Sequence, residues 1–169
     1  MKRAIALTLL AACSAVAFAA DTVSLENGLL HAMQLKKGTT ERTGTSGRAI
    51  RAYQHAGLVS KTPRQRADYT DYYLLDKPVP FMGHELVLIE EEYIDKYIGC
   101  CVSPGVGITL KVHGSIKNLQ QFARASRCTL TDHVDVAQAL REVAIKNKVP
   151  KAYYASLSCR ERDAERDES

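Results

Sequence analysis

Apolar positions recur with the spacing of a helix in two segments near the N-terminus. In the first segment they are Leu25, Leu29, Leu30, Met33 and Leu35. This spacing predicts a helix over residues 24–37, which Ser24 caps and Gly38 ends. Residues 48–56 predict a second helix. The stretch between them, residues 39–47, is rich in Thr, Gly and Ser and is typical of a flexible loop.

The hydrophobic pattern changes to that of strands in the middle of the chain. Pro78 and Pro80 disfavour a helix before this point. Residues 86–92 begin with four apolar positions and continue into three glutamates, which predicts a buried strand. Residues 93–102 are rich in β-forming residues and predict another strand. Residues 106–112 alternate apolar and polar positions, so they predict a half-buried strand in the same sheet as the first.

The last third of the chain predicts two helices and a strand. One helix covers residues 115–127 and begins at a capping serine. The other covers residues 133–148, and Pro150 stops it. Apolar and polar residues alternate over residues 152–159, which predicts a final strand. The remaining residues, 160–169, are almost all charged and predict a disordered tail.

Helices and strands that segregate along the sequence in this way predict an α+β fold. We expect a single small domain with a mainly antiparallel sheet and helices packed on it. Residues 21–68 form a basic, partly helical N-terminal region, and residues 69–159 form the α+β core.

The first 20 residues have the three parts of a secretory signal peptide. Lys2 and Arg3 precede an apolar stretch, and small residues end it at Ala20. An alternative is a bacterial lipobox that ends in Cys13, where a lipid would anchor the chain to a membrane. Both alternatives predict export to the periplasm or beyond, and the mature chain contains no apolar run of the ~20 residues that cross a bilayer.

The charge balance of the mature chain excludes one class of partner. Removing Lys2 and Arg3 lowers the formal net charge from +4 by two, to +2. A value this close to neutral argues against nucleic acid as a partner. Nucleotide-binding and zinc motifs are absent from the sequence, so we expect neither a cofactor nor a metal.

The four cysteines beyond the signal segment predict two disulfides. Cys100 and Cys101 are adjacent, so in a strand their side chains point to opposite faces. We therefore expect one of them to bridge to Cys128 and the other to Cys159, although the count allows three connectivities. The alternative is a vicinal disulfide or dithiol at Cys100–Cys101 with redox or soft-metal chemistry.

Candidate chemistry elsewhere is limited. Glu90 and Glu92 share one face of their predicted strand, and two close carboxylates can serve the acid–base steps of a hydrolase. The alternative is a solvated strand end that prevents edge pairing.

Residues 36–66 contain eight Lys or Arg against one acid, Glu41, and predict a surface that binds an anionic partner. The candidate binding residues are Lys36, Lys37, Arg48, Arg51, Lys61, Arg64 and Arg66. Three tyrosines that follow predict a protein interface, because tyrosine combines a large contact area with a polar tip. They are Tyr69, Tyr72 and Tyr73.

The functional hypothesis is an exported, non-enzymatic binding or inhibitory protein that acts on an envelope protein or another anionic macromolecule. A small envelope hydrolase that uses Glu90 and Glu92 is the first alternative. A thiol-redox or soft-metal protein that uses Cys100–Cys101 is the second.

Overall fold

An antiparallel sheet organises the chain. The computed structural model describes residues 10–92 and 103–166, with residues 10–21 as backbone only. The six strands follow the spatial order β1-β2-β3-β4-β6-β5, and every neighbouring pair is antiparallel. The strands are β1 (Gln65–Ala67), β2 (Thr70–Phe81), β3 (His84–Glu92), β4 (Gly105–Lys111), β5 (Thr129–Thr131) and β6 (Tyr154–Arg160). The helices are α1 (Leu10–Met33), α2 (Ser46–His55), α3 (Lys117–Ala125), α4 (Val136–Glu142) and α5 (Glu161–Glu165). The predicted α+β class and antiparallel sheet are therefore confirmed.

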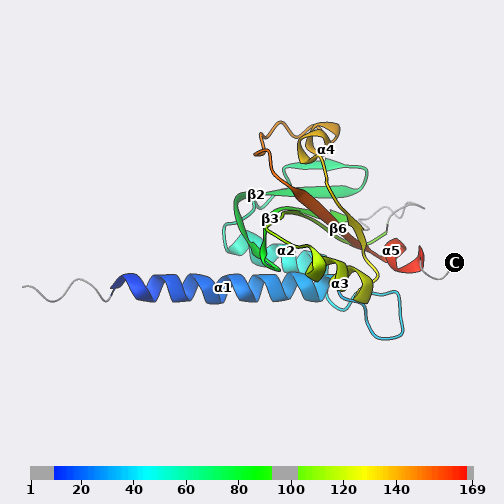
Figure 1. The fold of residues 1–169 in the computed structure, drawn as a ribbon, viewed down its shortest axis with the longest axis horizontal. Helices are drawn as coiled ribbons and strands as arrows, with labels where there is room; N and C mark the ends of the chain where they lie inside the picture. The colour runs from blue at the N-terminus through cyan, green and yellow to red at the C-terminus, as the bar shows by residue number, and fades with distance from the viewer. Residues whose placement is uncertain (1–9, 93–102, 167–169) are drawn as a thin grey trace, which may run out of the picture.

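Helices cover the sheet on both faces (Figure 1). The larger core joins α1, α2 and α3 to one face, around side chains such as Leu29, Ile50 and Leu119. The smaller core joins α4 to the other face, around Leu140 and Tyr154. The sheet is thus the middle of three layers, and the α4 layer is the thinner of the outer two.

The alternation predicted for the last strand is confirmed. Ala155, Leu157 and Cys159 all belong to the larger core, whereas Tyr154 belongs to the smaller core on the opposite face. The apolar face predicted for residues 115–127 is also confirmed, because Leu119 and Ala123 are buried and their apolar neighbours pack beside them.

Strand β2 was not predicted, because Pro78 and Pro80 argued only against a helix. The structure accommodates both prolines in the second half of β2, where a register shift interrupts the pairing with β3 between Leu74 and Val79. Strand β1 pairs only with residues 70–72, so among the described residues no strand pairs with the outer edge of β2 at the two prolines. Proline is tolerated at such a position because no ladder hydrogen bond is lost there.

The boundaries of helices α1 and α4 differ most from those predicted. Helix α1 runs on from Leu10 instead of beginning at residue 24, and it ends at Met33, after which Leu35 bridges to Arg42 in extended form. Helix α4 begins at Val136, because the side chain of Asp135 caps it by accepting from the amide of Gln138, and it ends at residue 142. The predicted signal peptide and Cys13 lie partly in α1, and their processing stays a prediction.

The charged C-terminal segment begins with the last residue of β6 and the short helix α5, Glu161–Glu165, in place of the predicted disordered tail. Helix α5 buries Asp163 and Ala164.

Within the described ranges, every helix falls short of the length or the apolarity needed to cross a bilayer. The strand predicted over residues 93–102 lies outside the described residues.

The disulfide pairing predicted for Cys128 and Cys159 is wrong. These two cysteines bond to each other, with Cα atoms 4.5 Å apart. The short strand β5 explains the pairing: its register places Thr129 opposite Ser158, so the next position along the ladder sets Cys128 opposite Cys159. Cys100 and Cys101 lie outside the described residues and lose the partners expected for them, so a second disulfide stays a prediction.

Replacing both bonded cysteines, as Cys128→Ala with Cys159→Ala, is expected to lower the free energy of unfolding. The bond closes a separation of 31 residues, for which loop-closure entropy gives about 3–4 kcal/mol. Urea denaturation followed by circular dichroism measures the loss. The same loss should appear when the wild-type chain is reduced, and an unchanged midpoint in both samples would contradict the pairing.

Candidate functional site

A cleft of about 490 Å³ opens between α3, β5 and α5, and three arginines line it. Helix α3 and the turn after it contribute Gln120, Ala123, Arg124, Arg127 and Cys128 to the lining. Strand β5 and the C-terminal segment contribute Thr129, Leu130, Asp163 and Arg166. Three arginines and one aspartate thus line the same cleft, and we call this site the arginine cleft.

The end of α3 places Arg127 in the cleft. The amide of Cys128 donates to the carbonyl of Ala123, and the amide of Arg127 donates to that of Arg124. This pair of bonds is a Schellman motif, whose C′ residue takes the left-handed conformation that usually belongs to glycine. Arg127 takes it here, with φ 46°. Its Nη1 also donates to the carbonyl of Ala164, 3.3 Å away, which ties the α3 end to α5.

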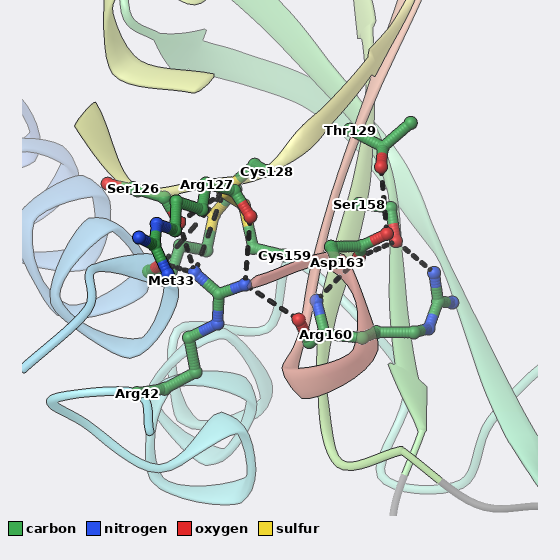
Figure 2. The surroundings of a disulfide bond; sticks show 10 residues. All are labelled: Met33, Arg42, Ser126, Arg127, Cys128, Thr129, Ser158, Cys159, Arg160 and Asp163. Atoms are coloured by element: carbon green, nitrogen blue, oxygen red, sulfur yellow. Dashed lines mark hydrogen bonds between the residues drawn. A yellow bond between two sulfur atoms is a disulfide. The ribbon is translucent and has the colours of Figure 1, made fainter. Parts of the chain in front are cut away.

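Asp163 forms the buried acidic part of the cleft. Its carboxylate accepts hydrogen bonds from Thr129 Oγ1 at 2.8 Å, from Ser158 Oγ at 2.6 Å and from the amide of Arg160 at 2.8 Å (Figure 2). The Nη1 atom of Arg166 lies 4.0 Å from the carboxylate. These contacts hold α5 against β5 and β6, which is why the segment is ordered despite its charge.

Arg42 lies behind the cleft and joins its parts. Nη1 donates to the carbonyls of Met33 at 2.9 Å and Ser126 at 2.6 Å, and Nη2 donates to that of Arg160 at 2.7 Å. Figure 2 shows this guanidinium beside the Cys128–Cys159 bond. Burial lowers the pKa of Arg42 from its ordinary value, an effect that the nearby Asp163 opposes.

The seven basic residues predicted to bind an anion are spread over several elements, and their use as one binding surface stays a prediction. Three of them are engaged in ion pairs: Lys36 with Glu41, Arg64 with Asp76, and Arg66 with Asp71. Arg48 and Arg51 lie on the exposed side of α2, and Lys61 lies in the loop after it. Lys36 and Lys37 line a side cleft of about 350 Å³ that shares Arg127 with the arginine cleft. Lys36 and Lys37 are therefore the members of the set whose cleft shares a described residue with the arginine cleft.

The arginines of the cleft were missed for two different reasons. Arg124 and Arg127 follow the apolar positions of a predicted helix, where a basic last turn is ordinary. Arg166 lies in the segment that was expected to be disordered.

The three tyrosines do not share one surface. Tyr73 is buried in the larger core, Tyr72 packs beside the smaller core, and Tyr69 is 53% exposed. Their strand alternation separates Tyr72 from Tyr73 across the sheet.

Glu90 and Glu92 lie on one face as predicted, and both bind arginine. Glu90 Oε2 lies 2.9 Å from Arg160 Nη2, and Glu92 Oε2 lies 2.7 Å from Arg160 Nε. Arg162 adds a bidentate pair to Glu92 at 2.6 and 2.7 Å. Gly107 lets the first pair cross β4, because a Cβ atom there would lie 2.8 Å from Glu90 Oε2.

This arrangement favours a structural role for the two glutamates over acid–base chemistry. Their side chains hold the C-terminal segment to β3.

Among the described residues, no group of three or more His, Cys, Asp or Glu side chains is arranged to hold a metal ion. No known protein family, curated protein or solved structure matches this chain.

The substitution Glu92→Gln is expected to destabilise the fold. The Glu92 side chain is 5% exposed and touches two arginines, and removing one partner of a buried ion pair costs about 3–5 kcal/mol. The control Glu85→Gln weakens partly exposed contacts with Lys111 and His113 and should cost less than about 1 kcal/mol. Urea denaturation compares the two. A Glu92→Gln chain of normal stability that has lost a hydrolytic activity would instead favour the hydrolase.

Glu91 is expected to make stability depend on pH. Burial raises the pKa of this carboxyl above its ordinary value of 4.5, and the hydrogen bond from Ser46 opposes the rise. Because the pKa is raised in the folded state, Glu91 contributes fully to the free energy of unfolding below pH 4.5. That contribution is lost as the pH rises through the folded-state pKa.

Glu91→Gln should therefore raise the free energy of unfolding at neutral pH, since the amide oxygen can still accept from Ser46. The difference from the wild type should shrink as the pH falls below the ordinary value of 4.5. Denaturation curves across the acid and neutral range measure it. If the stability difference between Glu91→Gln and the wild type instead grew toward low pH, the pKa of Glu91 would be lowered in the folded state, which contradicts the prediction.

Proposed function

We propose that this chain is a non-enzymatic binding or inhibitory protein of the bacterial envelope, and that the arginine cleft binds an acidic region of a partner protein. The observation that carries the proposal is the cleft itself, where arginines from α3, from the turn after α3 and from the end of α5 line one concave surface. Arginine is the side chain best suited to carboxylate recognition, because its planar fork donates two parallel hydrogen bonds.

Two further features support the proposed setting. The Cys128–Cys159 bond suits an oxidising compartment. The first 20 residues have the organisation of a signal peptide, with the lipidated alternative at Cys13. Both are consistent with a protein that meets its partner in the periplasm.

Charge reversal in the cleft is expected to abolish partner binding without unfolding the protein. Arg124 and Arg166 are both exposed, and the contact of Arg166 with Asp163 is long, at 4.0 Å, so the double variant Arg124→Glu with Arg166→Glu should fold. The matched control is Arg141→Glu with Lys148→Glu, which reverses two exposed charges outside the cleft lining. A photo-crosslinking residue at Gln120, in the cleft, is compared with one at Gln138 on α4.

The expected result is one envelope protein crosslinked from position 120 and not from position 138. Its yield should fall at least about tenfold with the cleft variant, which corresponds to a loss of about 1.4 kcal/mol, and should persist with the control. Equal yields from both positions, or none from position 120, would overturn the proposal.

A further inference from the structure

The arginine cleft straddles the outer edge of the sheet. Strand β5 is the last strand of the spatial order, and within the described part of the chain only β6 pairs with it. Leu130 packs toward the larger core on the α3 side, whereas Thr129 donates to Asp163 on the α5 side. Residues from both faces of β5 therefore line one cleft, so the edge of the strand lies at its floor.

The edge of a strand carries main-chain groups that can pair with another extended chain. Proteins commonly protect such an edge by keeping the strand short or by covering it. Strand β5 is short, at three residues, and among the described residues the cleft leaves space beside it where a covering element could lie. Main-chain pairing at such an edge supplies affinity, and side chains on either side supply specificity.

The cations are distributed on both sides of this edge. Arg124 comes from α3 on one face, Arg166 follows α5 on the other, and Arg127 lies where β5 begins. Beyond Arg127, the side cleft continues the basic surface to Lys36 and Lys37. Successive side chains of an extended peptide point to opposite faces, so acidic residues at neighbouring positions would meet arginines on both sides.

We propose that the partner docks as a short, acidic, extended segment that adds a strand along the outer edge of β5. This inference rests on the proposed function and specifies how the cleft is used. The three residues of β5 allow main-chain pairing over about 10 Å, and the basic side cleft extends the contact.

A phosphate headgroup suits this cleft less well than a peptide. The buried carboxylate of Asp163 lies in the lining between the arginines of α3 and Arg166. The three hydrogen bonds that it accepts come from two hydroxyl groups and an amide, which are neutral. They do not cancel the negative charge of the carboxylate, which therefore repels a compact dianion. An extended peptide carries its carboxylates on alternate sides and avoids concentrating charge over Asp163.

The test measures binding of the probe peptide acetyl-Thr-Glu-Glu-Glu-Glu-Val-amide to the full chain by calorimetry, together with amide hydrogen exchange. Its neighbouring glutamates point to both sides of an extended chain. A matched peptide with N-methyl groups on alternate amides has the same charge but cannot pair along one edge. We expect slower exchange within residues 129–131 when the first peptide binds. Affinity should fall at least about tenfold both for the N-methylated peptide and for the Arg124→Glu, Arg166→Glu variant, and should persist in the Arg141→Glu, Lys148→Glu control.

Three outcomes would overturn the inference. Equal binding of both peptides would show that charge alone holds the partner. Binding of inorganic phosphate or of phosphatidylglycerol vesicles at the cleft, without binding of the peptide, would assign it to a phosphate ligand. Failure of the peptide while an envelope protein still crosslinks from position 120 would leave the proposed function standing without strand addition, whereas failure of the crosslink removes the function itself.

Discussion

The buried guanidinium of Arg42 is the interaction on which the arrangement around the cleft depends. It donates to carbonyl oxygens at the end of α1, at the end of α3 and at the end of β6. Hydrogen bonds to a charged group contribute about 1.5–3 kcal/mol each, and burying an uncompensated charge costs several kcal/mol. The carbonyl ends of α1 and α3 carry partial negative charge, which offsets part of that cost without a carboxylate in direct contact. Arg42 therefore stabilises the fold only while the ends of α1, α3 and β6 all stay in place.

The Cys128–Cys159 bond and Asp163 act on the same junction from different sides. The disulfide joins the turn after α3 to β6, and Asp163 joins β5 to the start of α5. Arg160 and Arg162 then hold the C-terminal segment to β3 through Glu90 and Glu92. Because these contacts share residues or neighbours, their contributions to stability should not be additive. Their joint consequence is that a segment with almost no apolar residues is ordered, and that Arg166 is carried to the same cleft as Arg124.

Local patterning predicted the parts of this fold whose burial is periodic. The alternation in β6 and the apolar face of α3 follow from residues that lie one after another in the sequence. Strand β5 has no such pattern, because three residues are too few to show a period, and without β5 the pairing of Cys128 with Cys159 could not be predicted. The order of α5 was hidden for another reason: its stabilising partners, Thr129 and Glu92 among them, lie far away in the sequence. The arginine cleft combines both difficulties, since its three cations come from an ordinary helix end, a turn and a segment whose composition is typical of disorder.

Arg127 links the stability of this junction to its proposed use. A glycine at the C′ position of α3 would take the left-handed conformation at no steric cost, whereas a residue with a Cβ atom pays roughly 1–2 kcal/mol there. Arg127 recovers part of that cost through its hydrogen bond to Ala164, so its side chain both supplies charge to the cleft and holds α5. Substituting it would therefore change the cleft and its framework together. The charges of Arg124 and Arg166 lie on exposed side chains of the cleft. Reversing them changes the potential over the β5 edge and removes one long contact of the junction, the 4.0 Å approach of Arg166 to Asp163, while the hydrogen bonds of Asp163 to Thr129 and Ser158 remain.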